Sequence, residues 1–188
     1  SERARQAIIS AMNVIIIRAL PAADATAKRA QEAGFDTLVA PLFSVEALPW
    51  SVPNSADYDG LLLTSANAIR QGGSGIKSLG KLPVLAVGPT TAEAAGIAAL
   101  QVVLTSEEGA QQLVDGAYAK GFRKLLWLRG ADFTPFFPPA AMTCDSVAVY
   151  RHAALPIGKK LNKALTKPSL FLVHSARSAE HLAREMAR

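Results

Sequence analysis

The chain has 188 residues, of which 50% are hydrophobic and 19% are charged, so it can bury a large core and is not a disordered chain. A single cysteine, Cys144, excludes an internal disulfide and a Cys-based zinc site, and three histidines argue against a His-rich metal centre. The apolar runs reach about five residues, far fewer than the ~20 that span a bilayer. The net charge of +5 suits an acidic ligand or a nucleic acid. We therefore expect a cytoplasmic protein without a metal site.

We expect the natural chain to start at Met12, after which short apolar runs alternate with helix patterns. The expected strands are Val14–Ile17, Thr37–Val45, Leu61–Leu63, Val84–Val87, Val102–Leu104, Leu125–Leu128, Val147–Tyr150 and Leu170–Val173. Several of these runs are apolar on consecutive positions, which is typical of strands buried on both faces. Strands that alternate with helices over short connections predict an α/β protein with parallel sheets.

Helix starts are expected directly after several of these strands. Pro21 opens a helix that Gly34 closes, and a helix start is also expected at Thr64-Ser65-Ala66-Asn67 and at Ser175. Thr90 with Glu93, and Thr105 with Glu108, have the spacing of a capping box.

The chain contains an internal repeat. IIIR at 15–18 resembles LWLR at 126–129, DTLV at 36–39 resembles DSVA at 145–148, and LLLTSAN at 61–67 resembles FLVHSAR at 171–177. The three pairs keep their order and lie about 110 residues apart, so we expect two similar halves. The segment VLAVGPTTAEAA at 84–95 has no counterpart before Arg188. On this arithmetic we expect the second half to lack its last part.

Hydroxyl side chains gather where strands end and helices begin. Ser65, Thr90, Thr91, Thr105 and Ser175 each suit the ordinary role of an N-cap. The same helix ends present free N–H groups and a positive dipole to an anion, at the sheet edge where ligands of such folds bind. Both interpretations are compatible.

Two arginines and one tyrosine complete the candidate set. Arg18 and Arg129 follow equivalent strands of the repeat, where a guanidinium can bind an anionic group. Tyr150 ends an apolar strand; it is either a packed residue or a phenol that donates a proton to a leaving hydroxyl. The sequence shows no carboxylate pair, Cys/His dyad or Ser/His/Asp order that stands out.

The ordered motifs resemble the uroporphyrinogen-III synthase family. They are VIIIR at 14–18, APL at 40–42, DYDGLLLTSANAIR at 57–70, LPVLAVGPTTAEAA at 82–95, LLWLRGAD at 125–132, VAVYRHA at 147–153 and FLVHSARSAEHLA at 171–183. The resemblance implies two flavodoxin-like parallel-sheet domains with a cleft between them, joined by a two-stranded linker. It places domain 1 at 12–35 plus 157–188, domain 2 at 50–145 and the linker strands at 36–49 and 146–156.

The resemblance also implies an activity. The family closes the linear tetrapyrrole hydroxymethylbilane to uroporphyrinogen III, with loss of water and inversion of the terminal ring, and needs no cofactor. It makes Tyr150 the residue that assists hydroxyl departure, and it implies a monomer that binds a polycarboxylate and no nucleic acid or membrane. The implied substrate contacts are Ser65, Asn67, Thr90, Thr91, Arg129, Ser175 and Arg18.

One departure concerns Arg18, because Ala19 and Leu20 separate it from Pro21 where many members have the proline directly. Two other functions stay open at this point. One is a non-catalytic two-domain protein that binds an anionic tetrapyrrole or a similar polycarboxylate. The other is a nucleic-acid-binding protein, which the scattered basic residues and 6% aromatic residues make the weakest of the three.

Overall fold

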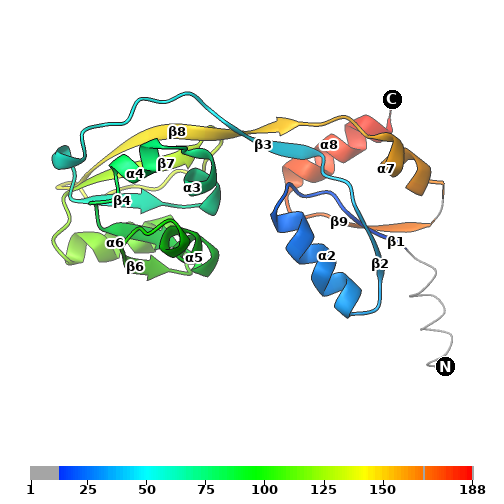
Figure 1. The fold of residues 1–188 in the computed structure, drawn as a ribbon, viewed down its shortest axis with the longest axis horizontal. Coiled ribbons are helices and arrows are strands. Elements are labelled where there is room, and N and C mark those ends of the chain that lie inside the picture. The colour runs from blue at the N-terminus through cyan, green and yellow to red at the C-terminus, as the bar shows by residue number, and fades with distance from the viewer. Residues whose placement is uncertain (1–12, 167, 188) are drawn as a thin grey trace. The chain divides into compact units, whose positions relative to one another are not determined.

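A computed structural model describes residues 13–166 and 168–187, so the expected start at Met12 lies outside the described residues. The chain divides into two compact units (Figure 1). Of the described residues, unit 1 holds those up to Val45 and from Ala153 onward, and unit 2 holds Glu46–His152. The domain and linker limits expected from the sequence stay a prediction.

Unit 1 is built on a parallel sheet of three strands in the order β2-β1-β9. Its elements are β1 (Asn13–Ile16), α2 (Ala22–Glu32), β2 (Asp36–Val39), α7 (Lys159–Ala164), β9 (Ser169–Leu172) and α8 (Ala176–Met186). Val14 and Ile16 pack with Ala23 of α2 on one face. Ile15 packs with residues of α7 and α8 on the other. Burial of β1 on both faces explains its unbroken apolar sequence.

Unit 2 contains most of a second sheet, in the order β3-β8-β7-β4-β5-β6. Its own elements are the 3₁₀ turn η1 (Ser55–Asp57), β4 (Gly60–Leu63), α3 (Ala66–Gln71), α4 (Gly75–Ser78), β5 (Val84–Val87), α5 (Pro89–Ile97), β6 (Val102–Ser106), α6 (Ala110–Ala119) and β7 (Lys124–Gly130). β4 pairs in parallel with β5 and β7, and β7 pairs in parallel with β8.

Two strands pass from one unit into the other: β3 (Phe43–Ala47) and β8 (Thr143–Ala154). The Leu48 N–H donates to the Val149 carbonyl at 2.9 Å, and the Leu155 N–H donates to the Leu42 carbonyl at 2.8 Å. Residue numbers rise along one strand as they fall along the other, so this pair is antiparallel.

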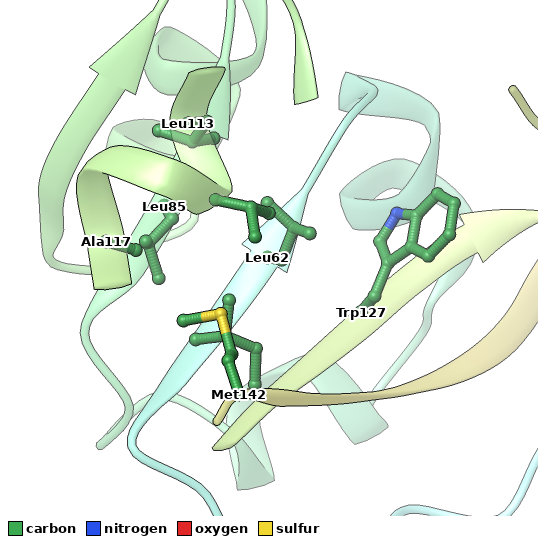
Figure 2. Packing of buried hydrophobic residues seen from close by; sticks show 8 residues of the cluster. Leu62, Leu85, Leu113, Ala117, Trp127 and Met142 are labelled. Atoms are coloured by element: carbon green, nitrogen blue, oxygen red, sulfur yellow. The ribbon is translucent and has the colours of Figure 1, made fainter. Parts of the chain in front are cut away.

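The core of unit 2 on the α6 side joins one helix to buried residues of β4, β5 and β7. Figure 2 shows Leu113 and Ala117 of α6 over Leu62 and Leu85, with Met142 and Trp127 beside them. Leu62 and Leu85 are fully buried. The neighbouring residues of β4 and β5 point to the opposite face by the alternation of strands, and they are buried as well. The sheet is therefore covered on both faces, as the apolar runs predict.

The parallel α/β class is confirmed, and the repeat is visible in the strand pairing. Ile15 lies opposite Phe171 where β1 meets β9, and Leu126 lies opposite Leu61 where β7 meets β4. These are the positions that the sequence repeat matches. The two halves therefore pair their central strands in the same register.

Three local predictions are wrong. The expected strand Thr37–Val45 is two strands, because the chain leaves the sheet at Ala40–Leu42, where Pro41 has no N–H for a ladder. Thr90 and Thr91 are no caps, since Pro89 opens α5 and Gly88 precedes it at φ +77°. Thr105 lies in β6, and the Oγ of Ser106 accepts the Glu108 N–H at 3.2 Å instead.

Candidate functional site

The order of the strands in unit 2 determines where a ligand can enter. From β4 the chain winds through β5 to β6, and it then returns across the sheet to β7 and β8. The winding direction therefore reverses between β4 and β7. In open parallel sheets the crevice for a ligand lies at the carboxyl ends of the strands beside such a reversal. Thr64 follows β4 there, and Arg129 and Gly130 close β7.

A cavity of about 730 Å³ opens at this point. Its lining includes three of the candidate residues, Ser65, Arg129 and Tyr150. The rest of the wall comes from the start of α6, the turn before it and the loop after β7. These residues are Glu108, Gly109, Ala110, Gln111, Asp132, Phe133, Thr134, Pro135 and Phe136, with Thr64, Val87 and Gly130 at strand ends and Trp127 within β7.

Ser65 caps α3 at the rim of this cavity. Its Oγ accepts the Asn67 N–H at 3.2 Å, which is the ordinary N-cap interaction. The preceding Thr64 accepts a hydrogen bond from Trp127 Nε1 at 3.0 Å, so the turn is tied to β7. The cap and the cavity lining coexist in the same residue.

Arg129 is held at the end of β7 by several contacts. Its Nε donates to Ser146 Oγ at 3.1 Å, and its Nη1 donates to the Gly130 carbonyl at 2.9 Å. The guanidinium carbon lies 4.0 Å from the centre of the Phe133 ring. A guanidinium held in this way can offer its remaining N–H groups to an anion in the cavity.

Tyr150 lines the cavity from β8 and is 6% exposed. Its ring needs the absence of a side chain at Gly130, because a Cβ there would lie 2.9 Å from two ring carbons. The Ala131 N–H donates to the Tyr150 carbonyl at 2.8 Å, after a register shift between Arg129 and Gly130. The irregular end of β7 thus determines where the Tyr150 phenol lies.

The remaining candidates of unit 2 lie at neighbouring helix ends without lining this cavity. Asn67 is half-buried in the first turn of α3. Thr90 is exposed in the first turn of α5, whereas Thr91 is 5% exposed. The Gly88 N–H before them donates to the Ser106 carbonyl at 2.8 Å, which fixes the start of α5 beside β6.

The last two candidates, Arg18 and Ser175, belong to unit 1. Arg18 follows β1, and its Nη1 donates to Thr26 Oγ1 of α2 at 3.3 Å. Ser175 caps α8: its Oγ accepts the Ser178 N–H at 3.2 Å and lies 2.9 Å from Ser178 Oγ. The structure therefore brings three of the eight predicted residues together around one cavity.

A scan against protein-family models matches residues 24–187 to uroporphyrinogen-III synthase HemD. The chain belongs to the uroporphyrinogen-III synthase family. Membership makes it a hydro-lyase that cyclises hydroxymethylbilane in haem biosynthesis. A search of curated proteins found no match.

One solved structure, with a TM-score above 0.5, agrees with the family in fold. A mutant uroporphyrinogen III synthase from the extremely thermophilic bacterium Thermus thermophilus is 22% identical, with 93% of this chain and 77% of that chain covered and a TM-score of 0.54. The wild-type enzyme from the same bacterium is 23% identical over 93% and 76% of the two chains, with a TM-score of 0.42. A further Thermus thermophilus structure is 18% identical over 94% and 90%, with a TM-score of 0.38.

The aromatic part of the cavity was not among the residues predicted from the sequence or from the family resemblance. Trp127 and Phe133 meet edge to face with ring centres 5.4 Å apart, and Phe136 lies 4.7 Å from Trp127. The signal was available: a run of phenylalanines and prolines, FTPFFPP at 133–139, begins after a gap of four residues from the predicted strand Leu125–Leu128. Gln111 and Ser146, which hold this region, have no comparable signal.

Titratable groups away from the cavity have structural explanations. Burial raises the pKa of the Cys144 thiol to about 12, and the charge of Asp145 adds to the effect. Burial and the hydrogen bond to Asp145 raise the pKa of Tyr58. Over residues 13–166 and 168–187, no group of three or more His, Cys, Asp or Glu is placed to hold a metal ion. No helix in the same ranges is long and apolar enough to cross a membrane.

Proposed function

We propose that this chain converts hydroxymethylbilane to uroporphyrinogen III, with inversion of the terminal ring and loss of one water, at the cavity of unit 2. The observation that carries the proposal is the meeting of Tyr150, Ser65 and Arg129 around one cavity at the winding reversal of the sheet. A proton donor, a helix start and a fixed cation are the groups that a leaving hydroxyl and a polycarboxylate need.

Tyr150 is the proposed proton donor. Its phenol lines the cavity while the residue is 6% exposed, so water has little access to it. Transfer of the phenolic proton to the terminal hydroxyl lets water leave, and the C–O bond breaks to give a cationic azafulvene. Ring closure then returns a proton, so that the sum is substrate to product plus water. The azafulvene reacts readily, and the enzyme must hold the chain so that the inverted closure is the faster one.

The substrate carboxylates are the proposed partners of the other candidates. Arg129 binds one inside the cavity, where Glu108 and Asp132 also line the wall and repel carboxylates from their own side. Ser65, Asn67, Thr90 and Thr91 offer hydroxyl or backbone donors at the helix starts of unit 2. Arg18 and Ser175 extend the proposed set to the corresponding edge of unit 1. A net charge of +5 favours the approach of such an anion.

A coupled assay tests the proposal. Purified protein receives enzymatically generated hydroxymethylbilane, and the products are oxidised and separated into isomers. We expect the type III isomer, and we expect Tyr150→Phe to lower kcat by about tenfold or more. The matched control is Tyr118→Phe, because Tyr118 lies on α6 under the Arg123 guanidinium and does not line the cavity.

Two outcomes would contradict the proposal. Type I product alone is the result of spontaneous closure and would exclude the synthase activity for this chain. Binding of the tetrapyrrole without loss of water would favour a non-catalytic binding protein. We further propose a cytoplasmic monomer that needs no cofactor and binds no nucleic acid. Light scattering after gel filtration checks that the protein is a monomer. An assay in the presence of a chelator checks that activity needs no metal cofactor.

A further inference from the structure

The connection between β7 and β8 is unusual for parallel strands. Such strands are ordinarily joined by a helix, yet Ala131–Met142 contains none. The segment lies instead on the α6 side of the sheet, where Phe136 and Met142 pack on the core around Trp127. We call Ala131–Met142 the aromatic loop. The aromatic loop forms part of the cavity wall, in the place of the helix that ordinarily connects two parallel strands.

Gln111 of α6 fixes the middle of the aromatic loop. Its Oε1 accepts the Phe137 N–H at 2.9 Å, and its Nε2 donates to the Phe137 carbonyl at 3.0 Å. One side-chain amide thus binds both polar groups of one residue, as a neighbouring strand would. The Phe137 side chain itself is 79% exposed and is absent from the cavity wall.

The aromatic loop contacts Arg129 through the Phe133 side chain and through the Ala131 carbonyl, which accepts a hydrogen bond from Arg129 Nη1 at 3.5 Å. The Phe133 ring lies 4.0 Å from the guanidinium carbon and stands edge-on to Trp127, with an angle of 89° between the ring planes. The Nε of Arg129 is bound to Ser146 on the neighbouring strand. A guanidinium stacks well on an aromatic face, because the face is negative and the planar cation is weakly hydrated.

We propose that Phe133 is a positioning residue that holds Arg129 ready to bind a substrate carboxylate. The proposal rests on the proposed function of Arg129 as a carboxylate ligand. An arginine free to rotate must lose that freedom when it binds, whereas one already held between Phe133 and Ser146 loses less. Phe133 therefore increases affinity without touching the reacting atoms.

The experiment compares four proteins: wild type, Phe133→Leu, Phe133→Tyr and Phe137→Leu. Calorimetry measures their binding of uroporphyrin III, an octacarboxylate that does not react, and the coupled assay gives KM and kcat. We expect Phe133→Leu to weaken binding and to raise KM by roughly 3- to 10-fold, with kcat unchanged within about twofold. Phe133→Tyr keeps the aromatic face and restores the affinity. Phe137→Leu, in the same loop but outside the cavity, behaves as wild type.

A double-mutant cycle with Arg129→Gln separates positioning from a structural role. If Phe133 acts through Arg129, Phe133→Leu has no further effect on uroporphyrin III binding in the Arg129→Gln background. An equal loss in both backgrounds would overturn the proposal, as would Arg129→Gln with wild-type affinity or a loss in Phe137→Leu as large as in Phe133→Leu. The cycle measures binding alone, so it decides this inference even if the wild-type protein makes no type III product and the proposed function fails.

Discussion

The corresponding sheet edges of the two units share their backbone and differ in what their arginines contact. In both, the central strand pair has the same register, and a serine with nearly the same backbone angles caps the following helix: φ −156° and ψ 140° at Ser65, φ −157° and ψ 150° at Ser175. Arg129, however, lies in a cavity wall against Phe133, whereas Arg18 donates to Thr26 of its own unit. The repeated framework thus fixes the caps, and the connecting loops decide which edge offers a cation.

The largest expected effect tests whether the two units are independently stable. Leu62→Ala removes a fully buried side chain from unit 2 and should cost about 2–5 kcal/mol. Because the cores of the two units are built from different residues, we expect only the unfolding transition of unit 2 to move in calorimetry. Val103→Ala, at a position 43% exposed in β6, is the control. A common shift of a single transition would show that the units unfold as one block.

The next prediction contrasts the two arginines directly. Arg129→Gln removes a charge-assisted contact in the cavity and should weaken uroporphyrin III binding by roughly 10- to 100-fold. Arg18→Gln should weaken it by about threefold or less, because Arg18 does not line the cavity. Calorimetry at two salt concentrations measures both. An equal loss of affinity in Arg129→Gln and Arg18→Gln would mean that the sheet edges of both units bind the anion. The predicted difference between the two arginines would then be wrong.

Much of the fold follows from the sequence, because its signals are local. Consecutive apolar runs predicted the parallel strands, and the shared Ser-Ala pair predicted two caps, at Ser65 and Ser175, that the structure confirms. The capping-box spacing failed at Thr90, since the positive φ of Gly88 and the ring of Pro89 start α5 two residues earlier. Spacing alone carries no information about the backbone angles that a glycine allows.

The cavity was less predictable, because it depends on contacts between distant segments. Sequence motifs identified Ser65, Arg129 and Tyr150 as candidates. The order of the strands in the sheet places all three at one cavity. Ser146 accepts a hydrogen bond from Arg129 because β8 pairs with β7 in a particular register. No pattern in the sequence predicts that contact. The place of the phenol depends in turn on a register shift at Gly130. Such shifts arise from packing, which single-sequence motifs do not encode.

A smaller effect concerns the two caps. Ser65→Ala and Ser175→Ala should each lower the free energy of unfolding by about 1 kcal/mol, since each removes one side-chain acceptor from a helix start. KM should rise more for Ser65→Ala, because Ser65 also lines the cavity. Thermal melts and the coupled assay measure the two effects separately. A larger KM change in Ser175→Ala would assign the substrate contact to unit 1.

The smallest effect is a pH dependence confined to unit 2. The Tyr58 hydroxyl donates to Asp145 Oδ2 at 3.1 Å, and burial together with this bond raises the pKa of Tyr58. The bond needs the protonated phenol. Its contribution is therefore complete below the unfolded-state pKa of about 10 and is lost as the pH rises through the higher folded-state value.

The comparison of wild type with Tyr58→Phe isolates this contribution. At pH 7 we expect the wild type to melt roughly 1–2 °C higher, because an exposed hydrogen bond is worth a fraction of a kcal/mol. Above about pH 10 the two melting curves should converge. Tyr118→Phe removes a hydroxyl from the same unit without affecting Asp145. The difference between its melting temperature and that of the wild type should not disappear above about pH 10. A Tyr58→Phe difference that persists undiminished to pH 11 would show that the ring, and not the hydrogen bond to Asp145, supplies the stability.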